Sequence, residues 1–333
     1  MRMRVVRWTA VVAVALLAGV GGRLWLSRPD TPLGMAPLLP GSAVCGPASA
    51  GGAEILVKPD VVYGKGGDEE LRLDLAMPAS GEGPFPLVVC IHGGAWCAGS
   101  RRDYSGAIRN LARHGYVAAT VEYRLAPKHR FPAQVEDVKC AVRYLRAHAA
   151  EWRIDPNRVG ALGDSAGAHL ALLLGLMGPA DGLEGKGGWP DQPSKVQAVV
   201  DYFGPADFAR WTLSPLAEPF IAKTLGMSSR EVVRAFLGTD DRKDPVISRA
   251  SPVTYVSRGD APVLTFHGTL DMLVPIRQSE LLHQTLAKAG VPCTLVPMPG
   301  LMHGWGGPRK RETDRRTIEF FDRWLKGSPP DGR

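Results

Sequence analysis

Five short, continuously apolar runs recur along the chain and constrain its fold more than any other feature. Such runs are typical of β-strands buried on both faces, as in a parallel sheet. Segments with helical periodicity separate them, and this alternation predicts an α/β fold with a mostly parallel, doubly wound sheet and helices on both faces. The runs are Pro86–Ile91, Tyr116–Val121, Arg158–Leu162, Val196–Tyr202 and Pro262–Phe266.

The clearest helical pattern covers Ala133–Ala149, where apolar residues recur at helical spacing opposite a charged face. Pro132 precedes it, a place where proline suits the first turn of a helix. Other helices are expected after Arg102, Ser165, Ser229, Ile276 and Glu312.

An antiparallel pair of strands is expected to open the sheet. Leucines alternate with polar residues over 71–75, a pattern typical of a strand with one buried face, and Ile55–Tyr63 is its expected partner. Cys293–Met298 is predicted as the last strand, before a final helix.

The first residues carry a targeting pattern. Arg2, Arg4 and Arg7 precede an uncharged stretch, Trp8–Gly22, which is the arrangement of an export signal. This stretch is shorter than the ~20 residues that cross a bilayer. The pattern therefore predicts an exported protein, periplasmic or secreted, and leaves open an uncleaved segment that anchors it to the membrane.

The domain organisation follows from these patterns. We expect an export signal or anchor over 1–26, a Pro/Gly-rich linker over 27–52, a catalytic domain over 53–327 and a tail over 328–333. Within the domain, the segment 203–260 is long for a connection between two strands, and we interpret it as a partly helical insertion or lid.

The charged residues and the cysteines exclude several partners. The net charge is +7, but Lys and Arg are scattered, so no nucleic-acid partner is expected. None of the five cysteines has zinc-site spacing, and no metal site is predicted. The sequence leaves open a Cys90–Cys97 disulfide, and it does not give the oligomeric state.

Gly163-Asp164-Ser165-Ala166-Gly167 matches the pattern G-x-S-x-G of a nucleophile elbow. The motif lies between an apolar strand that ends at Leu162 and an apolar helical run over 168–177. Gly163 and Gly167 would allow the sharp turn that exposes the hydroxyl. This context predicts Ser165 as a nucleophile.

A serine needs a histidine base, which a carboxylate must orient. We choose His303 among eight histidines because it lies in a glycine-bounded loop after the last predicted strand. Asp271 follows the preceding strand and is our choice for the acid, in preference to Asp240, Asp241, Asp244 and Asp260. The order Ser, Asp, His is that of α/β-hydrolases.

An oxyanion hole is expected in the loop after the first buried strand, which reads His92-Gly93-Gly94-Ala95-Trp96. Backbone amides aimed at a developing oxyanion are worth about 10²–10³ each in kcat. The expected donors are the amides of Gly94, Ala95 and Ala166.

Together these motifs resemble those of the α/β-hydrolase esterases of the hormone-sensitive-lipase-like and feruloyl/acetyl-xylan-esterase-like group. The likeness extends from about Val61 to Leu325, and it includes Tyr123–Pro127 with Phe131-Pro132, and Phe203-Gly204-Pro205 with Asp207. Ala95 replaces the usual third glycine of the lipase-like branch, whereas Trp96 is kept. This favours the HGG-x-W branch, which also includes kynurenine-formamidase-like amidases.

The resemblance implies hydrolysis of short-chain acyl esters, including acetylated or feruloylated sugars, without metal or cofactor. The alternatives are a kynurenine-formamidase-like amidase and, in a different class, a non-catalytic binding member of the fold. Trp96 and bulky residues of the insertion are expected to shorten the acyl pocket, unless they only pack the core of the insertion. These residues are Phe208, Trp211, Leu213, Leu216 and Phe220.

Overall fold

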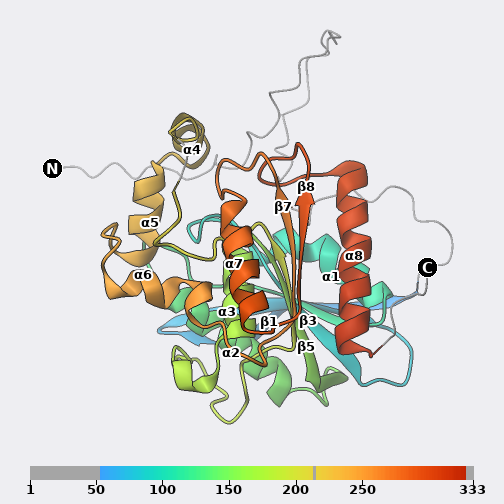
Figure 1. The fold of residues 1–333 in the computed structure, drawn as a ribbon. Helices are drawn as coiled ribbons and strands as arrows, with labels where there is room; N and C mark the ends of the chain where they lie inside the picture. Colours follow the sequence, from blue (N-terminus) through green and yellow to red (C-terminus); the bar gives the residue numbers. More distant parts are fainter. Residues whose placement is uncertain (1–52, 213–214, 328–333) are drawn as a thin grey trace, which may run out of the picture.

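The computed structural model describes residues 53–212 and 215–327, which form one eight-stranded sheet with helices on both faces (Figure 1). The strand order is β1-β2-β4-β3-β5-β6-β7-β8. The pairs β1–β2 and β2–β4 are antiparallel, and the remaining pairs are parallel. The predicted α/β fold with an antiparallel pair at its start is therefore confirmed. The strands are β1 (Ile55–Gly66), β2 (Glu69–Pro78), β3 (Phe85–Ile91), β4 (Val117–Val121), β5 (Ile154–Asp164), β6 (Ala198–Tyr202), β7 (Val263–Gly268) and β8 (Cys293–Met298).

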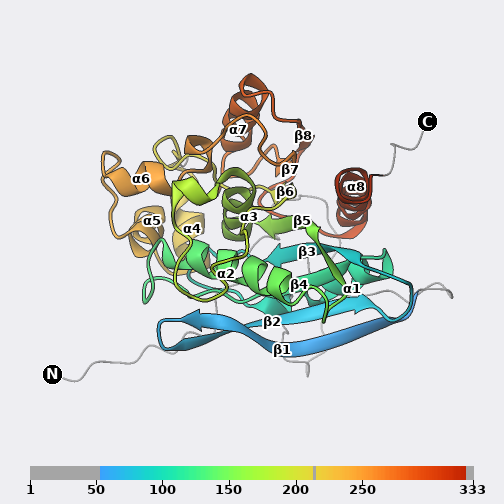
Figure 2. The same cartoon turned by 90° about the horizontal axis from the view of Figure 1, so that it is seen from below.

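The helices divide between the two faces of the sheet, as Figure 2 shows. Helices α2, α3 and α7 lie on one face, and α1 and α8 on the other. The α-helices are α1 (Ser105–Arg113), α2 (Ala133–Ala147), α3 (Ala166–Leu176), α4 (Glu218–Leu225), α5 (Ser229–Leu237), α6 (Pro245–Ala250), α7 (Arg277–Lys288) and α8 (Gly307–Leu325). Three 3₁₀ turns, η1 (Arg101–Tyr104), η2 (Pro179–Asp181) and η3 (Pro252–Thr254), complete the elements.

Strand β3 shows why a continuous apolar run was the correct signal. Side chains alternate across a strand, so Leu87, Val89 and Ile91 pack into the core under α2 and α3. Val88 and Cys90 pack into the second core, under α1 and α8. Both faces of β3 are therefore buried in a hydrophobic core, and a polar side chain at any of these positions would be removed from water.

Helix α8 begins at Gly307, six residues before Thr313, where the sequence predicted its start after Glu312. Pro308 lies in the first turn of the helix. Proline has no backbone N–H, but an N–H in this turn would have no partner within the helix, so no hydrogen bond is lost. Charged residues fill the turns that follow, so the apolar period that marks the helix becomes visible only further along.

The segment between β6 and β7 contains α4, α5 and α6, of which α4 contacts α5 and α5 contacts α6. Ser228 caps α5 by accepting a hydrogen bond from the amide of Glu231, 3.2 Å away. Gly226 and Gly238 end α4 and α5 with φ of 67° and 83°, in the left-handed region that glycine tolerates. The insertion therefore has its own local stop and start signals.

Several expectations fall on residues outside those described: the export signal or anchor, the linker and the C-terminal tail. Within residues 53–212 and 215–327, no helix is both long enough and apolar enough to span a membrane. Cys90 and Cys97 are both free thiols, so the disulfide that the sequence left open is not formed.

Candidate active site

The candidate site lies at the edge of the sheet where the parallel strands end. Ligands bind in this position in open α/β sheets, because the loops that follow the strands meet there. Ser165 follows β5, Asp271 follows β7, and His303 follows β8. The loop His92–Trp96, which we call the oxyanion loop, follows β3 at the same edge.

The turn at Ser165 is strained in the way that the G-x-S-x-G motif predicts. Ser165 has φ of 50° and ψ of −117°, a conformation that is costly for a residue with a side chain. A Cβ atom at Gly163 would lie 2.3 Å from the backbone of Gly167, and one at Gly167 would lie 2.1 Å from the carbonyl oxygen of Ile91. Only glycine fits both positions. The amide of Ser165 is held by the carbonyl of Tyr202, at 2.8 Å.

The three residues selected as nucleophile, base and acid form one hydrogen-bonded chain. Nε2 of His303 lies 2.9 Å from Oγ of Ser165, and Nδ1 of His303 lies 2.7 Å from Oδ2 of Asp271. These contacts join loops that are 138 and 32 residues apart in sequence. Because Asp271 can only accept, we assign the proton of the neutral imidazole to Nδ1, which leaves a lone pair on Nε2 facing the hydroxyl of Ser165.

Asp271 is buried and held as a charged acceptor. Its Oδ1 accepts hydrogen bonds from the amides of Leu273 and Val274, both at 2.9 Å. Burial alone would raise the pKa of Asp271, but the charge of His303 and hydrogen bonds from His267 and His303 outweigh it and lower the pKa to about 2. Asp271 is therefore ionised at any pH at which the protein would work.

His267 supports the loop that carries Asp271. Its Nδ1 lies 2.6 Å from Oγ of Ser279, and its Nε2 lies 2.7 Å from the carbonyl oxygen of Val274. The second contact requires a proton on Nε2, so His267 donates to Val274 and faces Asp271 at 3.3 Å from the same atom. His267 is therefore a hydrogen-bonded support for the loop that carries Asp271.

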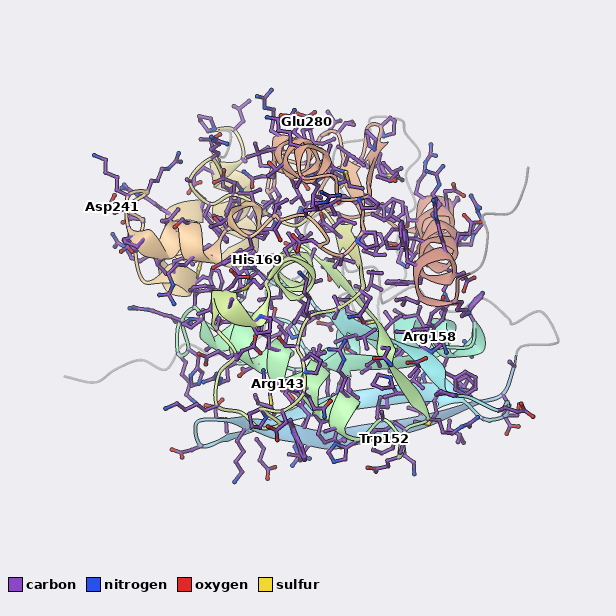
Figure 3. The ribbon with its side chains drawn as sticks, turned by 60° about the horizontal axis from the view of Figure 1, so that its bottom comes forward. Arg143, Trp152, Arg158, His169, Asp241 and Glu280 are labelled. Carbon is purple, nitrogen blue, oxygen red and sulfur yellow. The ribbon has the colours of Figure 1, made fainter. Side chains whose placement is uncertain are left out.

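The other candidate acids are occupied elsewhere. Asp240 pairs with Arg230 and Arg234, Asp244 caps α6, and Asp260 pairs with Lys195. Asp241 is exposed and lies at the outer end of the insertion (Figure 3).

Three successive residues of the oxyanion loop have a positive φ. Gly94, Ala95 and Trp96 have φ of 107°, 53° and 58°, so two non-glycine residues adopt the left-handed region. Within the described part of the chain, the amides of Gly94, Ala95 and Ala166 donate no hydrogen bond to the protein. Free amides at this edge of the sheet are what an oxyanion hole requires.

Asp164 fastens the oxyanion loop, a role that the sequence did not reveal. Its Oδ1 accepts hydrogen bonds from the amide of Gly93 at 3.0 Å and from the hydroxyl of Tyr104 at 2.8 Å. Complete burial raises the pKa of Asp164 to about 6, although Tyr104, His303 and Gly93 each favour the charged form. Tyr104 itself lies in η1 and belongs to no recognised motif, so nothing in the sequence could have linked it to this loop.

The sequence left open whether Trp96 shortens an acyl pocket or only packs a core, and the structure shows it packed in a core. It is 1% exposed and stacks on Phe236 of α5, with ring centroids 4.1 Å apart and planes 7° apart. Phe208 is also buried against Trp96, whereas Leu216 is 83% exposed. Trp96 and Phe208 instead belong to a buried aromatic cluster that joins the oxyanion loop to the insertion. Leu213 lies outside the described residues.

A pocket of about 310 Å³ lies between the start of the insertion and α7. Its volume is at the lower limit for small-molecule sites. Ser165, Asp271 and His303 do not line it. Glu280, on α7 in Figure 3, does so together with Arg210, Thr212, Pro275, Arg277, Gln278, Leu281 and Gln284.

Among the described residues, no three His, Cys, Asp or Glu side chains gather as potential metal ligands. The constellation that is present, a serine hydroxyl on a base with an ionised partner and free amides nearby, suits nucleophilic attack on a carbonyl carbon.

Known esterases are similar to this chain in sequence and structure. Esterase LipC of Mycobacterium tuberculosis is 32% identical over 225 residues, which are 67% of this chain and 53% of LipC. The isoprenylcysteine alpha-carbonyl methylesterase ICME of Arabidopsis thaliana is 28% identical over 74% of this chain and 56% of its own length. The chain thus spans little more than half the length of these curated relatives.

Among solved structures, a truncated carbohydrate esterase from gut microbiota superposes with a TM-score of 0.70 and 26% identity, over 84% of this chain and 99% of that one. An esterase of Thermogutta terrifontis gives a TM-score of 0.64 and 26% identity, over 85% and 95% of the two chains. The BD-FAE family model matches residues 73–286, which is more than half of the chain. The chain therefore belongs to the BD-FAE family, within the hormone-sensitive-lipase-like esterases of the α/β-hydrolase fold.

Proposed function

We propose that this protein is a serine carboxylesterase in which Ser165, His303 and Asp271 act as a catalytic triad. The observation that carries the proposal is the hydrogen-bonded chain from Ser165 Oγ through both nitrogens of His303 to the ionised Asp271. Esterase relatives and esterase neighbours support the same reaction.

The geometry suggests how each step would proceed. Nε2 of His303 takes the proton of Ser165 as Oγ attacks the ester carbonyl, and the amides of Gly94, Ala95 and Ala166 receive the oxyanion. Collapse of this intermediate passes the proton from His303 to the departing alcohol and leaves an acyl-serine. Water then attacks the acyl group, with His303 again as base, and Ser165 is regenerated. Asp271 keeps its charge throughout and stabilises the imidazolium.

The substrate class that we propose is short-chain acyl esters, with acetylated or feruloylated sugars as natural candidates. Structures of the Thermogutta terrifontis esterase with propionate bound and with butyrate bound support a short acyl site. The carbohydrate esterase among the structural neighbours supports the choice of a sugar as the alcohol.

The proposal is tested by comparing p-nitrophenyl acetate, an acetylated sugar and N-formylkynurenine as substrates of the purified protein. We expect hydrolysis of both esters, little of the formamide, and none by Ser165→Ala. Preference for the formamide would identify an amidase instead. Absence of all three activities in a folded protein would favour a binding member of the fold.

We also propose that the protein is exported, on the basis of the sequence pattern at residues 1–26. Full-length protein expressed in its natural host should fractionate with the periplasm, medium or membrane. A version that starts at Glu54 should stay in the cytosol and remain active. Native full-length protein that is free in the cytosol would contradict this proposal.

A further inference from the structure

Phe203 belongs to the Phe-Gly-Pro signature after β6, and its ring packs against the ring of His303. The two ring centroids are 4.5 Å apart, and the ring planes are tilted by 57°. Phe203 is 2% exposed, and its φ of 48° places a bulky residue in the left-handed region. Strained conformations of this kind persist where the surroundings fix them, and they cluster at functional sites.

The backbone around Phe203 is fixed on both sides by hydrogen bonds. Its amide donates to the carbonyl of Phe266 at 2.9 Å, and the carbonyl of the preceding Tyr202 accepts from Ser165 at 2.8 Å. The following amide, that of Gly204, donates to Asp201 at 2.8 Å. The turn that presents the ring of Phe203 is therefore tied directly to the nucleophile.

The hydrogen bonds of His303 leave one motion of its ring unrestrained. Nδ1 is bonded to Asp271 and Nε2 is bonded to Ser165. Rotation of the imidazole about the line between these bonds would lengthen neither of them greatly, so the two hydrogen bonds alone do not fix the tilt of the ring plane. Packing of Phe203 against the imidazole opposes this rotation.

We propose that Phe203 is a positioning residue for His303, which orients the imidazole and stabilises the positive charge that it gains when Ser165 is deprotonated. This inference rests on the proposed function. The face of an aromatic ring attracts a cation within about 6 Å of its centroid. The contact should therefore be stronger in the transition state, where the imidazolium exists, than in the resting enzyme.

Other groups also act on the charge of His303. Asp271 and Ser165 bond to it, Asp164 of β5 interacts with it electrostatically, and His267 shares Asp271. A substitution of Phe203 removes none of these four groups, although the ring of Phe203 also contacts that of His267, with centroids 6.4 Å apart. A difference in pH profile between wild type and such a variant therefore reports on the aromatic ring.

The experiment measures kcat/KM against pH with p-nitrophenyl acetate for wild type, Phe203→Leu and a protein that carries pentafluorophenylalanine at position 203. Leucine tolerates the local φ about as well as phenylalanine does. The fluorinated residue keeps the shape of the ring but reverses the charge of its face, so it tests the electrostatic contribution even if Phe203→Leu folds poorly. Phe321→Leu, equally buried but in α8 away from the site, is the matched control.

We expect both replacements at 203 to lower kcat/KM by about 3- to 30-fold through kcat, with KM nearly unchanged. We also expect the acid limb of the profile to move to lower pH, because the imidazolium loses a stabilising contact. Phe321→Leu should lower the thermal midpoint without changing the profile. The inference would be overturned if the fluorinated protein had the kcat/KM and the acid limb of wild type. It would also be overturned if the kcat/KM of Phe203→Leu lay within twofold of the wild-type value. An inactive wild type would instead refute the proposed function.

Discussion

Trp96 Nε1 donates a 3.2 Å hydrogen bond to Nδ1 of His169, and this bond joins the oxyanion loop to the helix behind Ser165. Because Nδ1 accepts, the proton of the imidazole is on Nε2, which donates to the carbonyl of Ala250 at 2.7 Å. Burial lowers the pKa of His169 to about 4, so the ring is neutral at working pH. One histidine thus connects the oxyanion loop, α3 and the insertion.

Trp96→Phe should remove this connection while keeping an aromatic ring in the cluster. It leaves Nδ1 of His169 buried without a partner, which costs about 1–3 kcal/mol of unfolding free energy. We expect kcat to fall by about 10- to 100-fold, since donors of the oxyanion loop would be misplaced. Urea denaturation and steady-state kinetics measure the two effects. Trp324→Phe, on the partly exposed side of α8, is the control, and a kcat for Trp96→Phe equal to that of this control would refute the connection.

Asp164→Asn tests the buried carboxylate that holds Gly93 and Tyr104. The pKa of Asp164 is raised to about 6, so its ionisation destabilises the folded state as the pH rises through that value. Asparagine can accept the same two hydrogen bonds but does not ionise. The variant should therefore gain stability relative to wild type above pH 6, on the order of 3 kcal/mol, and this gain should vanish below about pH 4. Urea denaturation at pH 4 and pH 8 measures it. If Asp164→Asn were more stable than wild type at pH 4 but not at pH 8, the raised pKa assigned to Asp164 would be contradicted.

Asp271→Asn tests which carboxylate orients His303. The substitution should lower kcat by about 10⁴-fold, because the asparagine amide can stabilise the wrong tautomer of the imidazole. The domain should stay folded by circular dichroism. Asp241→Asn, at the exposed outer end of the insertion, should behave as wild type. The assignment fails if Asp241→Asn is the inactive variant and Asp271→Asn retains near-full activity.

The acyl preference tests the proposed substrate class. We expect kcat/KM to be highest for acetyl to butyryl esters, with gradual changes of about 1–3 kcal/mol per methylene and a sharp fall once the site is full. A series of p-nitrophenyl esters from acetate to palmitate measures this preference. A maximum at palmitate would identify a lipase and reject the short-chain proposal.

The sequence predicted the parts of this structure that depend on local patterns. Continuous apolar runs identified the strands buried on both faces, and the glycines at 163 and 167 identified a turn that no Cβ atom can enter. His303 and Asp271 could be chosen because each follows a strand, and parallel strands end at one edge. Their hydrogen-bonded arrangement is in the structure, and their catalytic role is a prediction that the experiments must test.

Long-range side-chain contacts could not be predicted in this way. The contact of Tyr104 with Asp164 joins residues 60 apart, and that of Trp96 with His169 joins residues 73 apart. No period or motif encodes such pairs, because they depend on how loops pack after the sheet has formed. The same limit explains why the sequence left the role of Trp96 open, since its burial depends on Phe236 in a distant helix.

Covalent labelling of Ser165 tests the central claim most directly. The purified protein is treated with a fluorophosphonate, which reacts with activated serines, and the modified peptide is identified by mass spectrometry while hydrolysis of p-nitrophenyl acetate is followed in parallel. We predict one adduct per chain on the peptide that contains Ser165, with proportional loss of activity, and neither labelling nor hydrolysis in Ser165→Ala. Labelling of a different residue, or undiminished hydrolysis by Ser165→Ala, would contradict the account.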